Sequence, residues 1–231
     1  MKKIAIAAAI CLPLVVGAEA TAKRLNSAAG VLGEIMSTPD KAIPMDLMRH
    51  AQCIVVIPGV KQGAFGVGAK YGKGFFSCRV GADWSAPGSI RIEGGSFGFQ
   101  IGVNETDVIL LIMNRRGADR LLSTQFTMGG AAEAAAGPVG RASLAQTDIS
   151  LRAEMLSWSR SRGAFAGISL QGATLRQDLD DNGDIYGKKL SNKQIINGPQ
   201  AWPKEGSEFH GVLNKYAARA AVPRAKKIAK K

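Results

Sequence analysis

Residues 61 to 103 carry the pattern that decides the fold, and they read KQGAFGVGAKYGKGFFSCRVGADWSAPGSIRIEGGSFGFQIGV. Glycine alternates here with aromatic, β-branched and polar residues, a pattern that favours strands joined by tight turns. Glycine inside a strand also marks places where two backbones approach closely. We therefore predict a glycine-rich antiparallel meander over this stretch.

Apolar runs on both sides of this stretch predict further strands. Residues 53 to 57 are wholly apolar and mostly β-branched, and Pro58-Gly59 closes them, so they predict a short buried strand. Residues 108 to 113 predict another, and strand character resumes at 165 to 175. Residues 143 to 158 could form two strands or one helix, because their apolar residues fit neither period cleanly.

Helices are expected towards both ends of the chain. Apolar residues recur every three or four positions from 21 to 36, which predicts an amphipathic helix, and a proline opens a short helix over 44 to 51. Serine caps predict two more, over 191 to 197 and over 207 to 221, and the apolar face of the last should dock on the sheet. The expected fold is a single α+β domain: a glycine-rich antiparallel sheet or partly closed barrel with flanking N- and C-terminal helices.

The first twenty residues have the form of a signal peptide. Lys2-Lys3 precede an uncharged run from 4 to 17, and Ala18-Glu19-Ala20 offers a small-x-small cleavage site. The run is shorter than the ~20 residues of a spanning helix, and Ile10 before Cys11 argues against lipidation. We expect a signal peptide at 1–20, the domain at 21–222, a basic tail at 223–231, and an exported, periplasmic protein.

The composition is that of a basic globular chain. Of 231 residues, 46% are hydrophobic, and the net charge is +12, which cleavage after Ala20 would lower to +11. Nucleic acid is not expected as a partner in an export compartment, so the charge favours anionic lipid headgroups or acidic envelope polymers, unless it only keeps the protein soluble. Cys53 and Cys78 either form a disulfide, which export permits, or are separate buried residues.

Several motifs resemble catalytic or ligand-binding sites without completing them. Residues 94 to 98 match G-x-S-x-G, with Asp107 and His210 following in hydrolase order, but strand-like sequence continues where a nucleophile elbow needs a helix. Residues 178 to 184 resemble half of a calcium loop, yet Lys189 stands where the closing carboxylate belongs, so an Asx-rich turn is the better interpretation. No phosphate loop and no zinc spacing fits. We expect no cofactor and no metal.

Basic residues beside glycine-rich turns remain as candidates for binding. Exposed backbone N–H groups and a neighbouring arginine can hold a phosphate, although a scattered solvated surface is the alternative. The candidates for contact with a lipid headgroup are Lys70, Lys73, Arg115, Arg116, Arg141, Arg160 and Arg162.

Six short blocks, in order along the chain, resemble the SYLF domain family. They are residues 82–87 (ADWSAP), 94–102 (GGSFGFQIG), 106–108 (TDV), 136–141 (AGPVGR), 158–172 (WSRSRGAFAGISLQG) and 186–187 (YG). The resemblance covers roughly residues 25 to 215. No SH3 or FYVE-type sequence accompanies the blocks, and Trp158 stands where the family often has tyrosine.

The resemblance implies a lipid-binding module, since eukaryotic members bind phosphoinositides and the yeast branch also binds and bundles actin. It also implies that the signature residues fix turns and close strand contacts. Those residues are Trp84, Ser85, Pro87, Gly98, Asp107, Gly137, Pro138, Gly140, Ser159, Gly163, Phe165, Gly167, Gly172, Tyr186 and Gly187. We expect a non-enzymatic envelope protein that binds anionic phospholipid peripherally. The alternatives are a structural or partner-binding envelope protein and a serine hydrolase that uses Ser96.

Overall fold

The computed structural model describes residues 12–38, 42–65, 67–97, 102–129, 134–138, 153–161, 164–167, 170 and 172–218. Its strands are β1 (Cys53–Phe65), β2 (Val67–Val80), β3 (Asp83–Trp84), β4 (Gly88–Phe97), β5 (Gly102–Ile112), β6 (Gln125–Thr127), β7 (Ala134–Ala136), β8 (Met155–Ser161), β9 (Ala164–Gly167) and β10 (Thr174–Gln177). Its helices are α1 (Leu12–Ser37), α2 (Met45–His50), α3 (Arg115–Leu121), α5 (Leu179–Tyr186), α6 (Asn192–Asn197) and α7 (Ser207–Ala217), with the 3-10 helix η2 (Lys204–Gly206).

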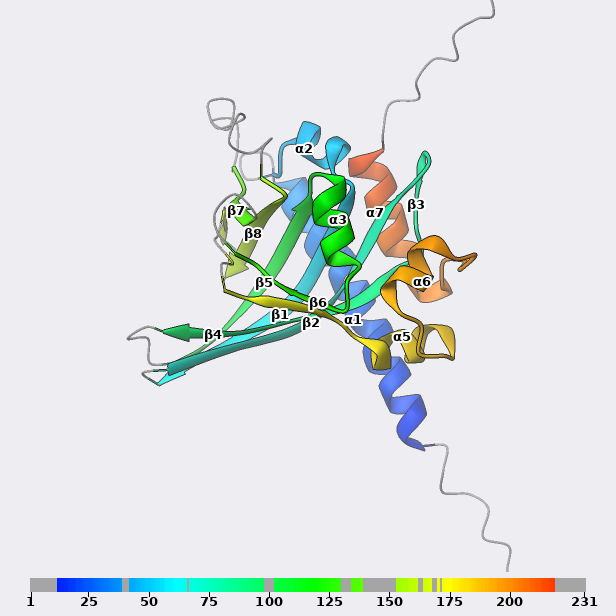
Figure 1. The fold of residues 1–231 in the computed structure, drawn as a ribbon, viewed down its shortest axis with the longest axis horizontal. Coiled ribbons are helices and arrows are strands. Elements are labelled where there is room, and N and C mark those ends of the chain that lie inside the picture. Colours follow the sequence, from blue (N-terminus) through cyan, green and yellow to red (C-terminus); the bar gives the residue numbers. More distant parts are fainter. Residues whose placement is uncertain are drawn as a thin grey trace, which may run out of the picture.

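One curled sheet forms the centre of the molecule (Figure 1). Its strand order is β6-β10-β4-β2-β1-β5-β8-β7, with β3 added on β2 and β9 on β8. The long strands β1, β2 and β4 pair antiparallel in chain order, which confirms the predicted glycine-rich meander for these strands. The next strand, β5, departs from it and pairs antiparallel with β1 instead of β4. The pair β7 and β8 is parallel. The α+β fold with a partly closed sheet between N- and C-terminal helices is therefore confirmed.

The two faces of the sheet bury two separate cores. In β2, Phe75 packs with residues of α1 and α7, whereas its neighbour Phe76 packs with α3 residues on the opposite face, because successive strand residues point to opposite sides. Figure 1 shows α1 and α7 side by side behind the sheet and α3 in front of it. The sheet is thus covered on both faces over its central part.

The first strand does not end where the sequence indicated. It continues through Pro58-Gly59 to Phe65, and its register with β2 shifts between Val56 and Lys61. Gly59 has φ +59°, a conformation that glycine adopts without strain. A β-bulge therefore accommodates the proline and glycine and bends the strand instead of ending it.

The predicted helices are present, with corrections at their ends. The first begins at Leu12 instead of 21, and the Ser191 cap is a full capping box with Gln194. The Ser207 side chain caps nothing: Ser207 is the first residue of α7, Gly206 holds the cap position, and the helix ends at Ala217. Furthermore, α7 packs mainly along α1, because the apolar stripe of α1 already covers that face of the sheet.

Three other local predictions are also revised. Residues 178 to 184 form neither a calcium loop nor an Asx-rich turn, since Asp178 caps α5 by accepting N–H groups of Asp180 and Asp181. Strand character at 165 to 175 divides into β9 and β10. The stretch 143 to 158 lies mostly outside the described residues, and its described end belongs to β8.

Cys53 and Cys78, which the sequence left open, form a disulfide between paired positions of β1 and β2. Both residues are buried in the core that faces α3. Among the described residues, no helix is both long and apolar enough to cross a bilayer.

Candidate functional site

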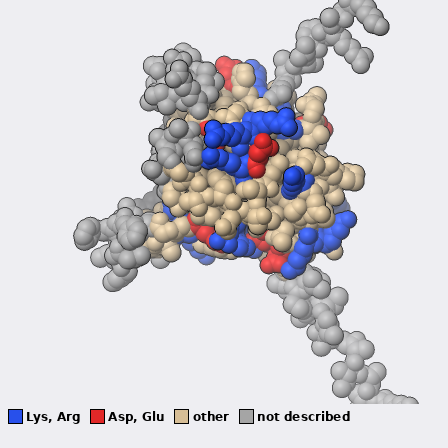
Figure 2. Space-filling view, viewed as in Figure 1, with Lys and Arg blue, Asp and Glu red and all other residues tan. Residues whose placement is uncertain are grey.

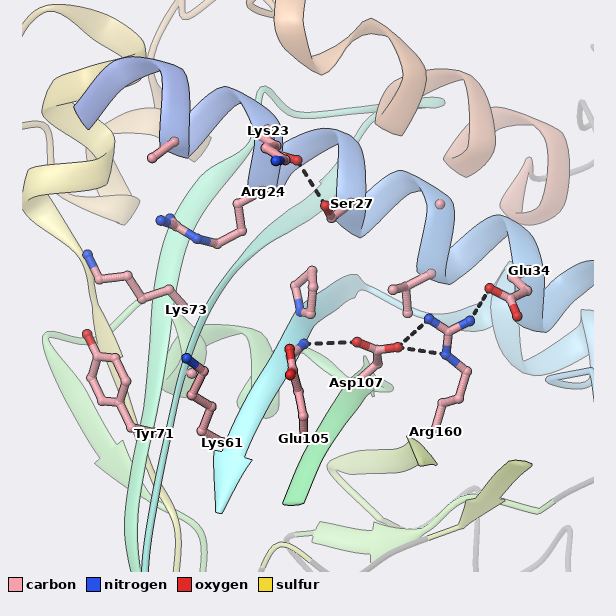
Figure 3. Close-up of a pocket in the computed structure, with 16 residues that line it drawn as sticks. Lys23, Arg24, Ser27, Glu34, Lys61, Tyr71, Lys73, Glu105, Asp107 and Arg160 are labelled. Atoms are coloured by element: carbon pink, nitrogen blue, oxygen red, sulfur yellow. Dashed lines mark hydrogen bonds and ion pairs between the residues drawn. The ribbon is translucent and has the colours of Figure 1, made fainter. Parts of the chain in front are cut away.

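A groove of about 760 Å³ lies between α1 and the sheet (Figure 3). One side is the polar flank of α1, and the other is formed by β1, β2, β5 and β8. Five basic and three acidic side chains line it. Because the apolar stripe of α1 packs on the sheet, the charged residues of the same helix are left facing this groove.

An ion-pair network closes one end of the groove. Asp107 on β5 lies opposite Arg160 on β8, and Arg160 Nε and Nη2 are 2.6 and 2.5 Å from Asp107 Oδ2. Arg160 also pairs with Glu34 on α1, while Asp107 Oδ1 accepts the Gly59 N–H at 2.9 Å. Burial alone would lower the pKa of Arg160, but its hydrogen bonds with Glu34 and Asp107 outweigh this and raise it. This network fastens α1 and the β1 bulge to the sheet.

A second network closes the other end, next to α5. Lys73 Nζ lies 2.8 Å from Asp178 Oδ2 and 2.9 Å from Asp181 Oδ1, and Arg24 of α1 pairs with Asp181 as well. Both carboxylates are buried. Burial alone would lower the pKa of Lys73, but the hydrogen bonds to Asp178 and Asp181 outweigh this effect and raise its pKa. These charges are already neutralised within the fold.

The cations left for an outside ligand are two lysines at the mouth of the groove. Lys23 on α1 and Lys61 on β1 are exposed, and neither has an ion-pair partner among the described residues. Tyr71, 48% exposed, lies opposite Lys61 in the sheet. The mouth therefore offers two ammonium groups and a phenol, an arrangement suited to contact with an anionic surface.

Two of the three residues of the serine hydrolase alternative have other partners in the structure. Ser96 lies in strand β4, as the continued strand pattern predicted, and Asp107 is engaged by Arg160. His210 is stacked on Trp202 and lies 3.0 Å from Asp83 Oδ1. Its contact with His210 is the main reason that the pKa of Asp83 is lowered. Across the part of the chain that the structure describes, no group of His, Cys, Asp or Glu could hold a metal ion.

The headgroup candidates predicted from sequence are divided among several places. Lys73 and Arg160 line the groove. Lys70 is three residues from Lys73 on the same strand, so it faces the opposite side of the sheet, and burial lowers its pKa. Arg115 and Arg116 lie on α3, in front of the sheet, where basic side chains gather in Figure 2. Arg141 and Arg162 lie outside the described residues.

Sequence reasoning missed Lys23 as a binding candidate, and it did not place Lys61 among the selected headgroup candidates. The sequence does indicate which residues of β2 line the groove together, because Tyr71 and Lys73 are two residues apart and therefore lie on the same face of the strand. The approach of Lys23 could not be found this way, since it depends on where α1 crosses the sheet.

Several of the signature residues make close contacts in the structure. Tyr186 donates its hydroxyl to the Pro87 carbonyl at 2.6 Å, and burial raises its pKa. Trp158 Nε1 donates to the Pro138 carbonyl at 3.0 Å, and a Cβ on Gly137 would lie 2.1 Å from its ring. Gly187 ends α5 with φ +69°.

The other signature residues lie in strands and turns. Ser85 Oγ accepts the Cys78 N–H at 3.0 Å beside the buried Trp84. Ser159 lies in β8 opposite β9, which holds Phe165 and Gly167, and Gly172 has φ +79°. The described residues do not include Gly98, Gly140 and Gly163.

The described residues form one curled sheet with a buried tryptophan, Trp158, flanked by N- and C-terminal helices. Comparison with known proteins shows the family to which this architecture belongs. A family model, Ysc84, described as "Las17-binding protein actin regulator", matches residues 93–216. The chain belongs to this family, the SYLF family that its sequence blocks resemble.

Relatives carry names that describe binding or regulation. "SH3 domain-containing YSC84-like protein 1" of Xenopus laevis is 33% identical over 184 residues, covering 78% of this chain and 55% of the relative. The human protein of that name is 28% identical over 183 residues, 78% of this chain and 53% of its own length. "LAS seventeen-binding protein 3" of Saccharomyces cerevisiae is 31% identical over 164 residues, which cover 69% of this chain and 35% of the relative. The chain spans about half the length of the YSC84-like relatives it matches.

Proposed function

We propose that this chain is a non-enzymatic, exported envelope protein that binds anionic phospholipid surfaces peripherally. The observation that carries the proposal is that Lys23 and Lys61, at the mouth of the α1 groove, have no ion-pair partner in the part of the chain that the structure describes. The net charge of +12 supplies the wider attraction. Each lysine near an anionic bilayer contributes about 1 kcal/mol of attraction.

The paired cations of the groove support this contact without making it themselves. Arg24, Lys73 and Arg160 hold α1 against the sheet through carboxylates. A fixed helix keeps Lys23 of α1 at a set position across the groove from Lys61 of β1, so both can meet the same surface. Preorganised charges lose less conformational freedom on binding.

Vesicle sedimentation tests the proposal. The full chain is mixed with phosphatidylcholine vesicles, with or without phosphatidylglycerol, over a series of salt concentrations. We expect binding that grows with phosphatidylglycerol and weakens with salt, because exposed charges are screened beyond about 8 Å at physiological ionic strength. Equal binding to neutral vesicles in high salt would remove the electrostatic basis.

A matched pair of variants locates the contact. Lys23→Glu with Lys61→Glu reverses both groove-mouth charges, whereas Lys193→Glu with Lys204→Glu makes the same charge change at exposed positions on α6 and η2. The groove variant should lose at least about tenfold more affinity than the control. Equal losses would mean that net charge alone drives the binding.

Export is supported by the leader-like sequence of residues 1–20 and by the Cys53–Cys78 disulfide, a bond that persists in oxidising compartments. Cell fractionation followed by intact mass measurement tests it. We expect the periplasmic form to begin at Thr21. A full-length chain recovered from the cytoplasm would contradict this.

A protein partner is the second candidate function. It is favoured by the family description, "Las17-binding protein actin regulator", and by the yeast relative's name, "LAS seventeen-binding protein 3". For an exported chain the partner would be another envelope protein. If vesicles fail to bind the chain under all conditions above, cross-linking in the intact envelope becomes the decisive experiment.

A further inference from the structure

A second basic cavity lies away from the α1 groove and shares no lining residue with it. Its volume is about 320 Å³, and it opens where β4, β10 and β6 meet the start of α5. We call it the arginine pocket. The lining residues used below are Arg91, Arg176, Lys189, Asp180, Gln125 and Gln177.

Strand register places the basic residues of this region in one row. Lys73 of β2 lies opposite Arg91 of β4, and Arg91 lies opposite Arg176 of β10, which in turn faces Gln125 of β6. The side chains of such directly opposed residues share a face of the sheet. Like charges placed directly opposite destabilise a sheet, so this row needs compensating negative charge.

Carboxylates balance the positive charge fully at the Lys73 end of the row and only in part at the Arg91 and Arg176 end. Lys73 has two carboxylates, Asp178 and Asp181. Arg91 and Arg176 share one: Arg91 Nε is 2.6 Å from Glu93 Oε1, and Arg176 Nε is 3.2 Å from Glu93 Oε2. Within the described residues, Glu93 is the ion-pair partner of both guanidinium groups, and no other carboxylate pairs with either.

This arrangement leaves N–H donors unused at the cavity. Arg91 Nε donates a hydrogen bond to Glu93, whereas Arg176 Nε is buried and has no hydrogen-bond partner, although its charge pairs with Glu93. Among the described residues, the terminal Nη groups of both arginines keep their N–H donors. Gln177 Oε1 accepts the Asn192 N–H at 3.2 Å, which leaves the Gln177 amide NH₂ as a further donor. Lys189 is held near the cavity by Asp180 at 2.6 Å.

We propose that the arginine pocket binds a phosphate group, carried either by a small soluble molecule or by a phosphorylated lipid headgroup. Guanidinium groups form bidentate charge-assisted hydrogen bonds with phosphate oxygens. Two guanidinium groups, an amide and an ammonium offer more donors than the two oxygens of a carboxylate can accept, and a phosphate has three or four oxygens. This site goes beyond the proposed attraction to anionic bilayers, because it uses other residues and recognises a particular group.

Titration of the ¹⁵N-labelled chain with inorganic phosphate, at constant ionic strength set with chloride, tests the pocket. We expect saturable shifts of the Arg91 and Arg176 Nε–H signals and of neighbouring backbone amides in β4, β10 and β6. Acetate in place of phosphate should produce much weaker shifts. Shifts that never saturate, or equal shifts with acetate, would overturn the proposal.

Variants separate the pocket from general charge. Arg91→Gln with Arg176→Gln should weaken phosphate binding at least about tenfold, while the matched control Lys204→Gln with Lys215→Gln, at exposed positions on η2 and α7, should leave it unchanged. Arg91→Lys with Arg176→Lys keeps the charge but loses the bidentate geometry. The phosphate affinity of this variant should therefore lie between that of the glutamine variant and that of the control. Circular dichroism confirms that each variant is folded. Unchanged binding in the glutamine variant would overturn the assignment.

Two further arms identify the source of the phosphate and keep this proposal separate from the groove. If the phosphate is lipid-borne, vesicles with phosphatidate should bind better than vesicles with phosphatidylglycerol, and the Arg91→Gln, Arg176→Gln variant should lose that preference. If the phosphate belongs to a soluble molecule, inorganic phosphate should still shift the signals of the pocket, and the chain should bind both kinds of vesicle equally well. Lys23→Glu with Lys61→Glu should leave the phosphate titration unchanged, and a loss there would place the phosphate contact in the groove instead.

Discussion

The α1 groove and the arginine pocket are both rich in cations, yet the two regions use them differently. In the groove, Arg24, Lys73 and Arg160 each contact a carboxylate from another element, so these cations hold the fold together. In the arginine pocket, Arg91 and Arg176 share one glutamate, Glu93, which lies on the same strand as Arg91. The comparison shows that pairing, more than the number of basic residues, decides which of them are available to a ligand.

Breaking a groove network should have the largest effect. Asp181→Asn removes the buried carboxylate that Arg24 and Lys73 share, so we expect a loss of about 3 kcal/mol in unfolding free energy. Arg176→Gln in the arginine pocket should cost less than about 1 kcal/mol, since its ion pair is partly exposed. Urea denaturation at neutral pH measures both values. If the two losses were equal, the distinction between structural and available cations would fail.

The sheet could be predicted from sequence, but the groove could not. Glycine alternation and apolar runs are local signals, and they identified β1, β2, β4 and β5 before any contact was known. The same local reasoning missed α5, because Asp178 and the polar residues after it are typical of a turn. The ion pair between Lys73 and Asp178, which holds the start of this helix against the sheet, is not visible in the local sequence. The groove joins residues of five elements, so its composition depends on register and helix placement.

Basic side chains were the hardest to assign from sequence. Lys73 and Arg160 were selected for their charge, and the structure gives both of them internal partners. Lys70 and Lys73 are three residues apart on one strand, so their side chains lie on opposite faces of the sheet. Arg91 and Arg176 come together only through strand pairing across 85 positions of sequence. Sequence spacing carries no information on such a pair.

An alkaline titration sharpens the comparison through Lys73. Because its folded pKa is raised above the ordinary 10.5, Lys73 contributes stability that is fully present below about pH 10.5 and is lost as the pH rises through the folded value. Lys73→Arg keeps its charge in this range, so it should lose less stability than the wild type, by about 1 kcal/mol or less. Denaturant midpoints measured from pH 9 to 11.5 test this, with the exposed Lys204→Arg as the control. Parallel curves for all three chains would show that the network does not depend on the Lys73 charge.

The smallest expected effect belongs to Asp180, at the edge of the arginine pocket. Its carboxylate is exposed and pairs with Lys189, whose hydrogen bond lowers the pKa of Asp180. Asp180→Asn should therefore leave the urea midpoint of unfolding almost unchanged, because exposed ion pairs contribute little to stability. It also removes a negative charge from the pocket lining and releases Lys189, so phosphate affinity should rise about two- to threefold, a small gain because exposed charges interact weakly. The phosphate titration described above measures the gain, and Asp119→Asn on α3 controls for net charge. A lower affinity in Asp180→Asn would mean that Asp180 positions Lys189 for the ligand instead of competing with it.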